Sequence, residues 1–358
     1  MKTKTINSIQ DHNAFQIEKI EALGDPLVNL KKNINWEDFR PKLTAIHSKE
    51  RKSNAGATPF DVVFMLQILI LQQLNNLADE KTEFMIRDRL TYQRFLSIKC
   101  GDRIPDAKTI WVFRNTMMAL GLYVPLFDEF NRQLAELGYS VKQGQLIDAT
   151  FIEAPRQRNT REENAQIKAG ETPEAWKAKG KEPMLRQKDV DATWTKKNNE
   201  NHYGYKNHIN ADQQYKLIQS YEVSTASVHD SQVFEVLLDQ TLDESGNKRP
   251  VFADSAYRSV ACEAMLEAEE IPSKIHERPY KGKPLTDEQK ALNKEKSRVR
   301  VRVEHVFGAQ ALMGMHTIRT IGIERAKIGI CLRNLTYNMV RYIQLIAIKK
   351  NTQVAITT

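Results

Sequence analysis

Three acidic residues, far apart in the chain, have the types and settings that metal-assisted chemistry needs. Asp148 ends an apolar, strand-like run, and Asp254 ends another. Glu304 follows the basic run Arg298–Val303. A carboxylate at a strand end can point into the crevice at the sheet edge, where α/β sheets bind ligands. Three converging carboxylates could hold two hard divalent cations about 4 Å apart, an arrangement that suits phosphodiester chemistry.

The chain around these acids is basic and long enough to fold. It has 358 residues, a net charge of +8 and 41% hydrophobic residues, which argues against global disorder and allows about two or three domains. Between Lys274 and Arg302, ten Lys and Arg residues face four Asp and Glu residues, so the net charge of this run is 10 − 4 = +6. This excess just before Glu304 favours a polyanionic partner such as DNA.

The cysteines and the N-terminus bear on the compartment and on the class of site. Three cysteines, Cys100, Cys262 and Cys331, are widely spaced and form no CxxC pair, which argues against a structural zinc site and favours a reducing compartment. The N-terminus is polar, and no apolar run approaches the roughly 20 residues that span a bilayer. We expect a cytoplasmic protein, or one associated with the nucleoid in a bacterium.

The elements before residue 140 predict an α-helical domain over residues 1–140. Thr58, followed by a proline, predicts the cap of a buried apolar helix, and Asp106 predicts the cap of a later one. After Asp106, the side chains of Lys108 and Arg114 could read DNA from a recognition helix. A buried amphipathic helix is an equally good interpretation. The expected helices cover residues 62–77, 80–90, 107–120 and 127–137.

A different pattern begins after residue 140 and predicts a catalytic domain over residues 141–350. Residues 145–153 resemble a strand, and residues 156–200 form a polar excursion. Two β-rich runs, 202–211 and 215–225, predict a hairpin. A helix (233–242), a short strand (251–253), a helix (260–268), a strand (271–275) and a long C-terminal helix (326–348) follow. This order predicts a mixed sheet with a ribonuclease H-like fold, with one acid on the first strand and the next after the fourth.

Several of these residues also have ordinary structural interpretations. Asp148 and Asp254 could each serve only as a turn or cap residue. The run before Glu304 alternates with period two, as a strand does, yet its valines also share a helix face. Lys206 lies in a basic and aromatic strand that could contact DNA or face solvent. For Asp230, a helix cap is favoured over a role in the site.

Five motifs together resemble bacterial insertion-sequence transposases of the DDE type, in the insertion-sequence-five group. The resemblance covers about residues 25–345. Its motifs are Leu146-Ile147-Asp148-Ala149-Thr150, His202-Tyr203-Gly204-Tyr205-Lys206, Val228-His229-Asp230-Ser231, Ala253-Asp254-Ser255-Ala256-Tyr257 and the run Arg300–Gly308.

The resemblance implies that Asp148, Asp254 and Glu304 are the catalytic triad and ligate two Mg²⁺ ions, for which Mn²⁺ can substitute. The family has a basic residue four before the glutamate, and Arg300 stands there. Its tyrosine seven before is Ser297 here, and its lysine seven after is Ala311. The predicted DNA-binding residues are Arg298, Arg300, Arg302, Lys206, Lys108 and Arg114.

The implied partners are double-stranded DNA, at the inverted-repeat ends of the element and at the target, and further copies of the chain, as a homodimer or larger assembly on DNA. The implied activity is Mg²⁺-dependent cleavage of the element ends, followed by strand transfer. Two alternatives stay open. One is a decayed, non-catalytic repressor that only binds DNA, and the other is a metal nuclease without strand transfer.

Overall fold

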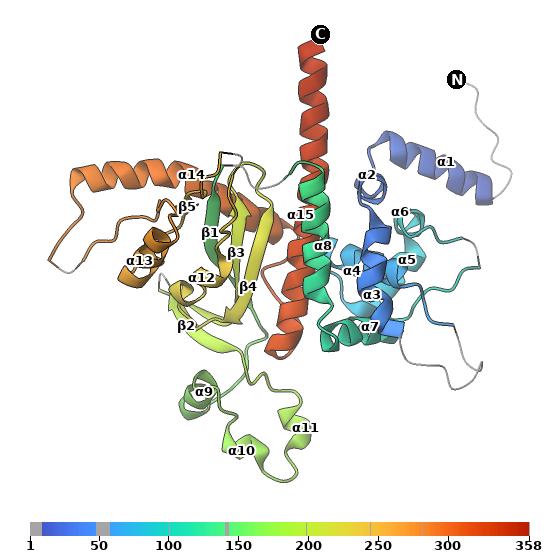
Figure 1. Cartoon of the computed structure of the whole chain (residues 1–358). Coiled ribbons are helices and arrows are strands. Elements are labelled where there is room, and N and C mark those ends of the chain that lie inside the picture. The colour runs from blue at the N-terminus through green and yellow to red at the C-terminus, as the bar shows by residue number, and fades with distance from the viewer. Residues whose placement is uncertain are drawn as a thin grey trace. The chain divides into compact units, whose positions relative to one another are not determined.

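The computed structural model describes residues 9–47, 58–99, 101–139, 143–197, 199–243, 245–280 and 282–357. Its contacts divide the chain into two compact units. The first comprises Met1–Phe130 with Tyr342–Thr358, and the second comprises Asn131–Arg341. Their elements are labelled in Figure 1.

The first unit is helical, as its sequence predicts. The apolar α4 is buried along almost its whole length and forms the centre of this unit. Asp61 caps it, since its Oδ1 accepts hydrogen bonds of 3.0 Å from the amides of Val63 and Phe64. The prediction of Thr58 as the cap was therefore wrong, because a carboxylate nearer the helix takes both free amides. The helices are α1 (Ile9–Ala22), α2 (Pro26–Asn33), α3 (Arg40–Leu43), α4 (Val62–Leu74), α5 (Asp79–Asp88), α6 (Leu90–Phe95), α7 (Ala107–Ala119) and α8 (Tyr123–Glu136), with short 3-10 turns at Trp36–Phe39 and Thr44–His47.

The second unit is built on a mixed sheet of five strands. These are β1 (Gln145–Glu153), β2 (Thr193–Lys197), β3 (Glu200–Asp212), β4 (Ile218–Thr225) and β5 (Val251–Phe252). The strand β3 pairs antiparallel with β1, β2 and β4, whereas β5 lies parallel to β1. A single parallel bridge joins Val251 to Ser273, where a full strand was expected. Three antiparallel strands followed by parallel additions beside the first make this the predicted ribonuclease H-like sheet.

Helices cover the two faces of this sheet. On one face, α12 (Phe234–Leu237) and α13 (Val260–Ala268) pack against Ile147 and Val251. On the other, α15 (Ile323–Thr357) packs through Ile330 against Ile152 and Tyr205. Because alternate residues of β1 point to opposite faces, Ile147 and Ile152 belong to different cores. Asp148 shares the face of Ile152.

The helix that carries Glu304 settles an ambiguity of the sequence. Residues Asp287–Leu312 form one continuous helix, α14, so the strand interpretation of the basic run is wrong. A capping box between Thr286 and Gln289 fixes its start. Val303, Val306 and Gln310 are buried on one side, which leaves the neighbouring arginines and Glu304 at the edge of the site or in solvent.

The polar excursion is a small helical segment with its own packing (Figure 1). It contains α9 (Arg161–Lys168), α10 (Glu174–Lys177) and α11 (Glu182–Leu185). Trp176 is buried at its centre, where its indole donates a 2.7 Å hydrogen bond to Glu163 and lies under the ammonium of Lys188. Local packing therefore explains this tryptophan.

One helix is shorter than expected. The expected helix 233–242 is reduced to Phe234–Leu237, and a 3-10 turn (Asp230–Gln232) precedes it. His229, not Asp230, caps that turn. Asp230 is buried with a different partner, described below. The expectation of Asp230 as a helix cap was therefore wrong.

Gly204 allows the backbones of β1 and β3 to approach closely, and its replacement should destabilise the folded protein. Its φ is +142°, and an added Cβ would lie 2.4 Å from the carbonyl oxygen of Ile152 and 2.7 Å from the amide nitrogen of Ala154. Both neighbours are backbone atoms that cannot rotate away. We expect Gly204→Ala to lower the free energy of unfolding by about 2–5 kcal/mol, through strain and overpacking.

Urea denaturation measures this change. Gly308→Ala serves as the matched control, because nothing lies within 4 Å of the added Cβ and the residue is helical. It should stabilise the protein by up to about 1 kcal/mol. Equal effects of the two substitutions would contradict the packing argument.

Within the described ranges, no single helix is long and apolar enough to cross a membrane. Two bent pairs, α4 with α5 and α7 with α8, reach that length and composition only in combination, as core helices also do.

Candidate active site

The apolar run in the sequence suggested that Asp148 ends a strand, but Asp148 lies within β1. The strand continues to Glu153, but β5 pairs only with Gln145 and Leu146, so β5 does not cover the edge of β1 at Asp148. The carboxyl group is buried, and its Oδ1 accepts a 2.9 Å hydrogen bond from the amide of Ala149. Burial raises the pKa of Asp148 to about 6, against the attraction of Arg300.

Asp254 follows β5 and stands in a turn beside Asp148. Its Oδ1 accepts a 2.8 Å hydrogen bond from the amide of Ala256, and its carbonyl accepts one of 3.2 Å from the amide of Tyr257. Ser259 caps the next helix, so Asp254 does not serve as its cap. The negative charge of Asp254 contributes to the raised pKa of Asp148, which puts the two carboxylates within electrostatic range.

Glu304 reaches the same place from α14. The side chain of Arg300, one helical turn earlier, joins it to Asp148. Its Nη1 lies 2.7 Å from Oδ2 of Asp148, and its Nη2 lies 3.1 Å from Oε1 of Glu304. Arg300 thereby links the acids of β1 and α14, and Asp254 follows the strand that pairs with β1.

The donor set fits hard divalent cations. It consists of carboxylate oxygens, and one of the acids is buried beside another of like charge, a setting that favours a bound cation. Within the described ranges, no three His, Cys, Asp or Glu side chains converge closely enough to form a complete ligand set as they stand. Between Asp148 and Glu304 the guanidinium of Arg300 supplies the positive charge.

Comparison with known proteins shows the family of this chain. A family model described as "Transposase DDE domain" matches residues 139–339, which is more than half of the chain. A second model, "Transposase domain (DUF772)", matches residues 15–116. The chain belongs to the DDE transposases. A solved cryo-EM structure of the piggyBac transposase synaptic complex with hairpin DNA is similar at 13% identity, with a TM-score of 0.42, and the alignment covers 91% of this chain and 76% of that one.

The family makes this protein a DNA-cutting and DNA-joining enzyme of transposition, and DDE transposase domains generally use divalent metal ions. The family models do not distinguish the insertion-sequence-five group from other branches. The assignment of the triad to individual residues rests on the motifs and on the geometry above.

Two buried or half-buried residues near these acids were not identified from the sequence. Tyr257 is fully buried, and no described residue hydrogen-bonds its hydroxyl, whose pKa is raised by burial and by the charges of Asp230, Asp148 and Asp254. His276 lies 3.3 Å from the Ser297 hydroxyl, and its pKa is lowered, first by burial and then by Arg300. Neither belongs to a local pattern that would have distinguished it, although Tyr257 lies in the motif of Asp254.

Lys206, a predicted DNA contact, is buried in the second unit. Its ammonium donates 2.7 Å hydrogen bonds to Oδ1 of Asp230 and to the carbonyl of Val228. The imidazole of His208 lies 3.9 Å from the same carboxylate. The ammonium is therefore held inside the fold by a structural ion pair, and the DNA contact at Lys206 stays a prediction.

Arg114, another predicted contact, is equally engaged. It forms a two-point ion pair with Asp79, at 2.8 and 2.7 Å, and a 3.0 Å hydrogen bond with Gln72. These bonds tie α7 to α4 and α5 and leave little of the guanidinium exposed. Arg114 therefore has a structural role and its DNA contact stays a prediction, whereas Lys108 on the same helix is exposed.

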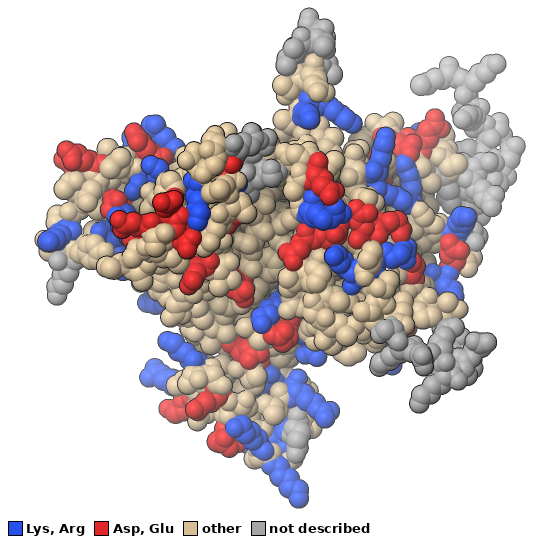
Figure 2. All heavy atoms as spheres, viewed as in Figure 1, with Lys and Arg blue, Asp and Glu red and all other residues tan. Residues whose placement is uncertain are grey.

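The remaining basic candidates lie on α14 and differ in how exposed they are and in whether other residues bind their guanidinium groups. Arg298 is exposed, and Arg302 donates a 3.1 Å hydrogen bond to the carbonyl of Gln213. Arg300 is bound to the two acids. Figure 2 shows Lys and Arg interspersed with Asp and Glu over the visible face, with several basic residues on the α9–α11 segment. Arg298 thus remains the most accessible of the predicted contacts on α14.

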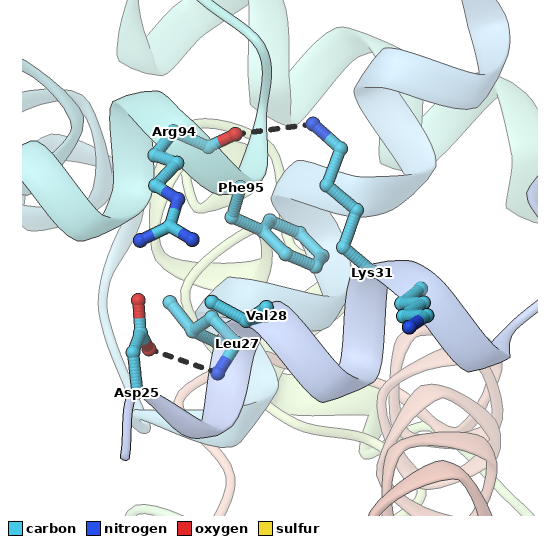
Figure 3. A pocket seen from close by; sticks show the side chains of 7 residues that line it. Asp25, Leu27, Val28, Lys31, Arg94 and Phe95 are labelled. Carbon is cyan, nitrogen blue, oxygen red and sulfur yellow. Dashed lines mark hydrogen bonds between the residues drawn. The ribbon is translucent and has the colours of Figure 1, made fainter. Parts of the chain in front are cut away.

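The first unit contains a pocket that is separate from the acids (Figure 3). It measures about 260 Å³, and its lining includes Lys31, Lys32, Arg94 and Asp25. The ammonium of Lys31 is bonded to the carbonyl of Arg94, and Asp25 accepts a hydrogen bond from the amide of Leu27. The first bond joins α2 to α6 and the second caps α2, so we assign the pocket a structural role.

Proposed function

We propose that this transposase cuts the ends of an insertion sequence and joins them to target DNA with two Mg²⁺ ions, for which Mn²⁺ can substitute, held by Asp148, Asp254 and Glu304. The observation that carries the proposal is the shared guanidinium of Arg300, which contacts Asp148 and Glu304 although they lie on β1 and α14. The third acid, Asp254, lies within electrostatic range of Asp148.

Bound metals would activate the attacking oxygen and stabilise the leaving 3′-oxygen. The chain contributes the geometry. β1 holds Asp148 in a rigid strand, the turn after β5 fixes Asp254 through the amide of Ala256, and α14 presents Glu304. Because these three elements are packed together, they would hold the phosphodiester in line with the attacking oxygen. The proposed reaction needs no covalent protein–DNA intermediate.

Element ends come in pairs, and joining both requires two such sites. We therefore propose a homodimer or larger assembly on DNA. The DNA partners would be the inverted-repeat ends and the target duplex, which would place the protein at the bacterial nucleoid.

A strand-transfer assay tests this function. Purified protein, Mg²⁺ and a labelled duplex carrying the ends of the gene's own element are combined with a target plasmid, and both the nicked 3′-end and the joined product are measured. Joined product supports the proposal. Nicking without joining would favour a metal nuclease, and sequence-specific binding without nicking would favour a repressor.

Arg298 should contribute to DNA affinity through phosphate contact, because it is exposed on the most basic segment of the chain. Each neutralised phosphate releases counterions, so log affinity falls with log salt by about 0.9 for each contact. Arg298→Gln should reduce the slope by about 1. Fluorescence anisotropy at several salt concentrations measures it, with Lys179→Gln in the excursion as the charge-matched control. If only the control loses slope, the DNA path crosses the excursion.

We assign recognition of the element ends to the helical unit, because a helix in the major groove reads base edges most easily. Lys108 is exposed on α7 and lines a cavity of about 410 Å³ together with Arg103 and Thr109. Lys108→Gln should reduce the preference for end DNA over scrambled DNA by about fivefold, roughly 1 kcal/mol. Competition binding with the full chain measures this, and Lys81→Gln, another exposed lysine of the unit, should leave the preference unchanged.

A further inference from the structure

Arg300 occupies the position between two acids of the triad. Its Nη1 lies 2.7 Å from Oδ2 of Asp148 and its Nη2 lies 3.1 Å from Oε1 of Glu304. The side chain is 20% exposed, against 12% for Asp148 and 56% for Glu304. Its Nε is buried, and no described residue accepts a hydrogen bond from it. The guanidinium is therefore drawn in by the acids rather than extended into solvent.

The acids need a cation at this place. Asp148 is buried, and the charge of Asp254 opposes its ionisation. A buried carboxylate beside a like charge is costly unless a positive group compensates it. The other cation that influences Asp148 electrostatically is Lys197, which is exposed, so its effect is weakened by solvent. Among the described residues, Arg300 is the cation that contacts Asp148 directly.

We propose that Arg300 is an internal counter-cation that holds the site before metal binds, and that a divalent ion binds between Asp148 and Glu304 by displacing its guanidinium. This inference rests on the proposed function, since it assumes that these acids ligate metal. Arg300 and Glu304 lie one turn apart on α14, so displacement requires rotation of a long side chain and no movement of the helix.

The displaced guanidinium is then able to bind a phosphate group of the DNA substrate. Arginine forms two parallel hydrogen bonds with a phosphate group as readily as with a carboxylate. Binding of metal and binding of the DNA backbone would therefore both favour the conformation of Arg300 in which its guanidinium has left the acids. Each should raise the affinity of the protein for the other by the same factor, because coupling between two binding events is reciprocal.

The test measures the affinity of the full chain for Mn²⁺ alone, by the electron paramagnetic resonance signal of the free ion at pH 8. Arg300→Gln should bind Mn²⁺ about tenfold more tightly than the parent, since the competing cation is gone. Arg298→Gln removes the same charge from the same helix without touching the acids, and its affinity should change less than threefold, as an exposed charge is screened. Unchanged or weaker binding by Arg300→Gln would overturn the proposal.

Asp148→Asn and Glu304→Gln separate this inference from the proposed function. Both should weaken Mn²⁺ binding in the parent. If neither does, metal binds elsewhere and the proposed function itself fails. If both do while Arg300→Gln binds no more tightly, only the role of Arg300 fails.

A second readout uses coupling. Mn²⁺ should strengthen binding of a mixed-sequence duplex, followed by anisotropy, more in the parent than in Arg300→Gln. Lys290→Gln, a change at an exposed lysine of the same helix, should retain the effect of Mn²⁺ seen in the parent. Circular dichroism shows whether Arg300→Gln is folded, and Arg300→Lys, which keeps one charge but cannot bridge both acids, should fall between parent and Gln in Mn²⁺ affinity. An Arg300→Lys affinity equal to that of the parent would contradict the bridging role.

Discussion

Replacing Asp148, Asp254 or Glu304 by the matching amide is expected to lower Mg²⁺-dependent cleavage of element-end DNA by about a thousandfold or more. A metal in such a site contributes several kcal/mol of transition-state stabilisation, and each 1.36 kcal/mol is a factor of ten in rate. The amide keeps the shape of the side chain but removes the negative charge that holds the cation. The loss should therefore appear in the rate of nicking and of strand transfer alike.

DNA binding by these variants should survive, because affinity comes mainly from phosphate contacts elsewhere. Glu295→Gln is the matched control, since Glu295 is an exposed acid on the same helix as Glu304. It should cleave within about twofold of the parent, because an isolated exposed charge has little effect at a distance. Should all three amide variants cleave within tenfold of the parent, the triad assignment is wrong.

The Asp230→Ala variant is expected to lose about 3–5 kcal/mol of unfolding free energy. Asp230 and Lys206 have side chains that are each 9% exposed, and Oδ1 lies 2.7 Å from Nζ. Removing the carboxylate leaves a buried ammonium with the carbonyl of Val228 and the ring of Phe151, 5.3 Å away, as neighbours and with no counter-charge in hydrogen-bond contact. Breaking a buried pair from one side is costly because the remaining charge stays out of water.

Urea denaturation of three variants separates this explanation from general loss of packing. Lys206→Met combined with Asp230→Leu removes both charges and should recover most of the loss, since well-packed apolar replacements of buried pairs are often neutral. Glu174→Ala breaks an ion pair with Lys177 in which the glutamate is 81% exposed, and it should cost less than about 1 kcal/mol. A single Asp230→Ala loss as small as that of Glu174→Ala would show that the Lys206 pair is not structural.

The same variants decide whether Lys206 touches DNA. If its ammonium is wholly used inside the fold, the Lys206→Met/Asp230→Leu protein should keep the salt dependence of the parent for DNA binding. A slope reduced by about 1 would confirm Lys206 as a phosphate contact.

The sequence by itself determined the elements whose signals are local. Asp106 caps α7 as predicted, by accepting the amide of Thr109, and the hairpin of β3 and β4 lies where two β-rich runs flank a polar turn. The succession of strands and helices after residue 140 was also predicted, although β2 lies inside the expected polar excursion and was missed. The three acids could be singled out because strand ends and family motifs are also read along the chain.

Only the tertiary structure decided which charges meet. Lys206 and Arg114 look like exposed DNA contacts in the sequence, but Asp230 and Asp79 lie opposite them in the fold. The bridge from Arg300 to Asp148 joins residues 152 positions apart. Local periodicity determines how a residue is placed on its own helix or strand, whereas the partner of a side chain depends on which distant element packs against it. For the same reason, the buried hydroxyl of Tyr257 became visible only in the fold.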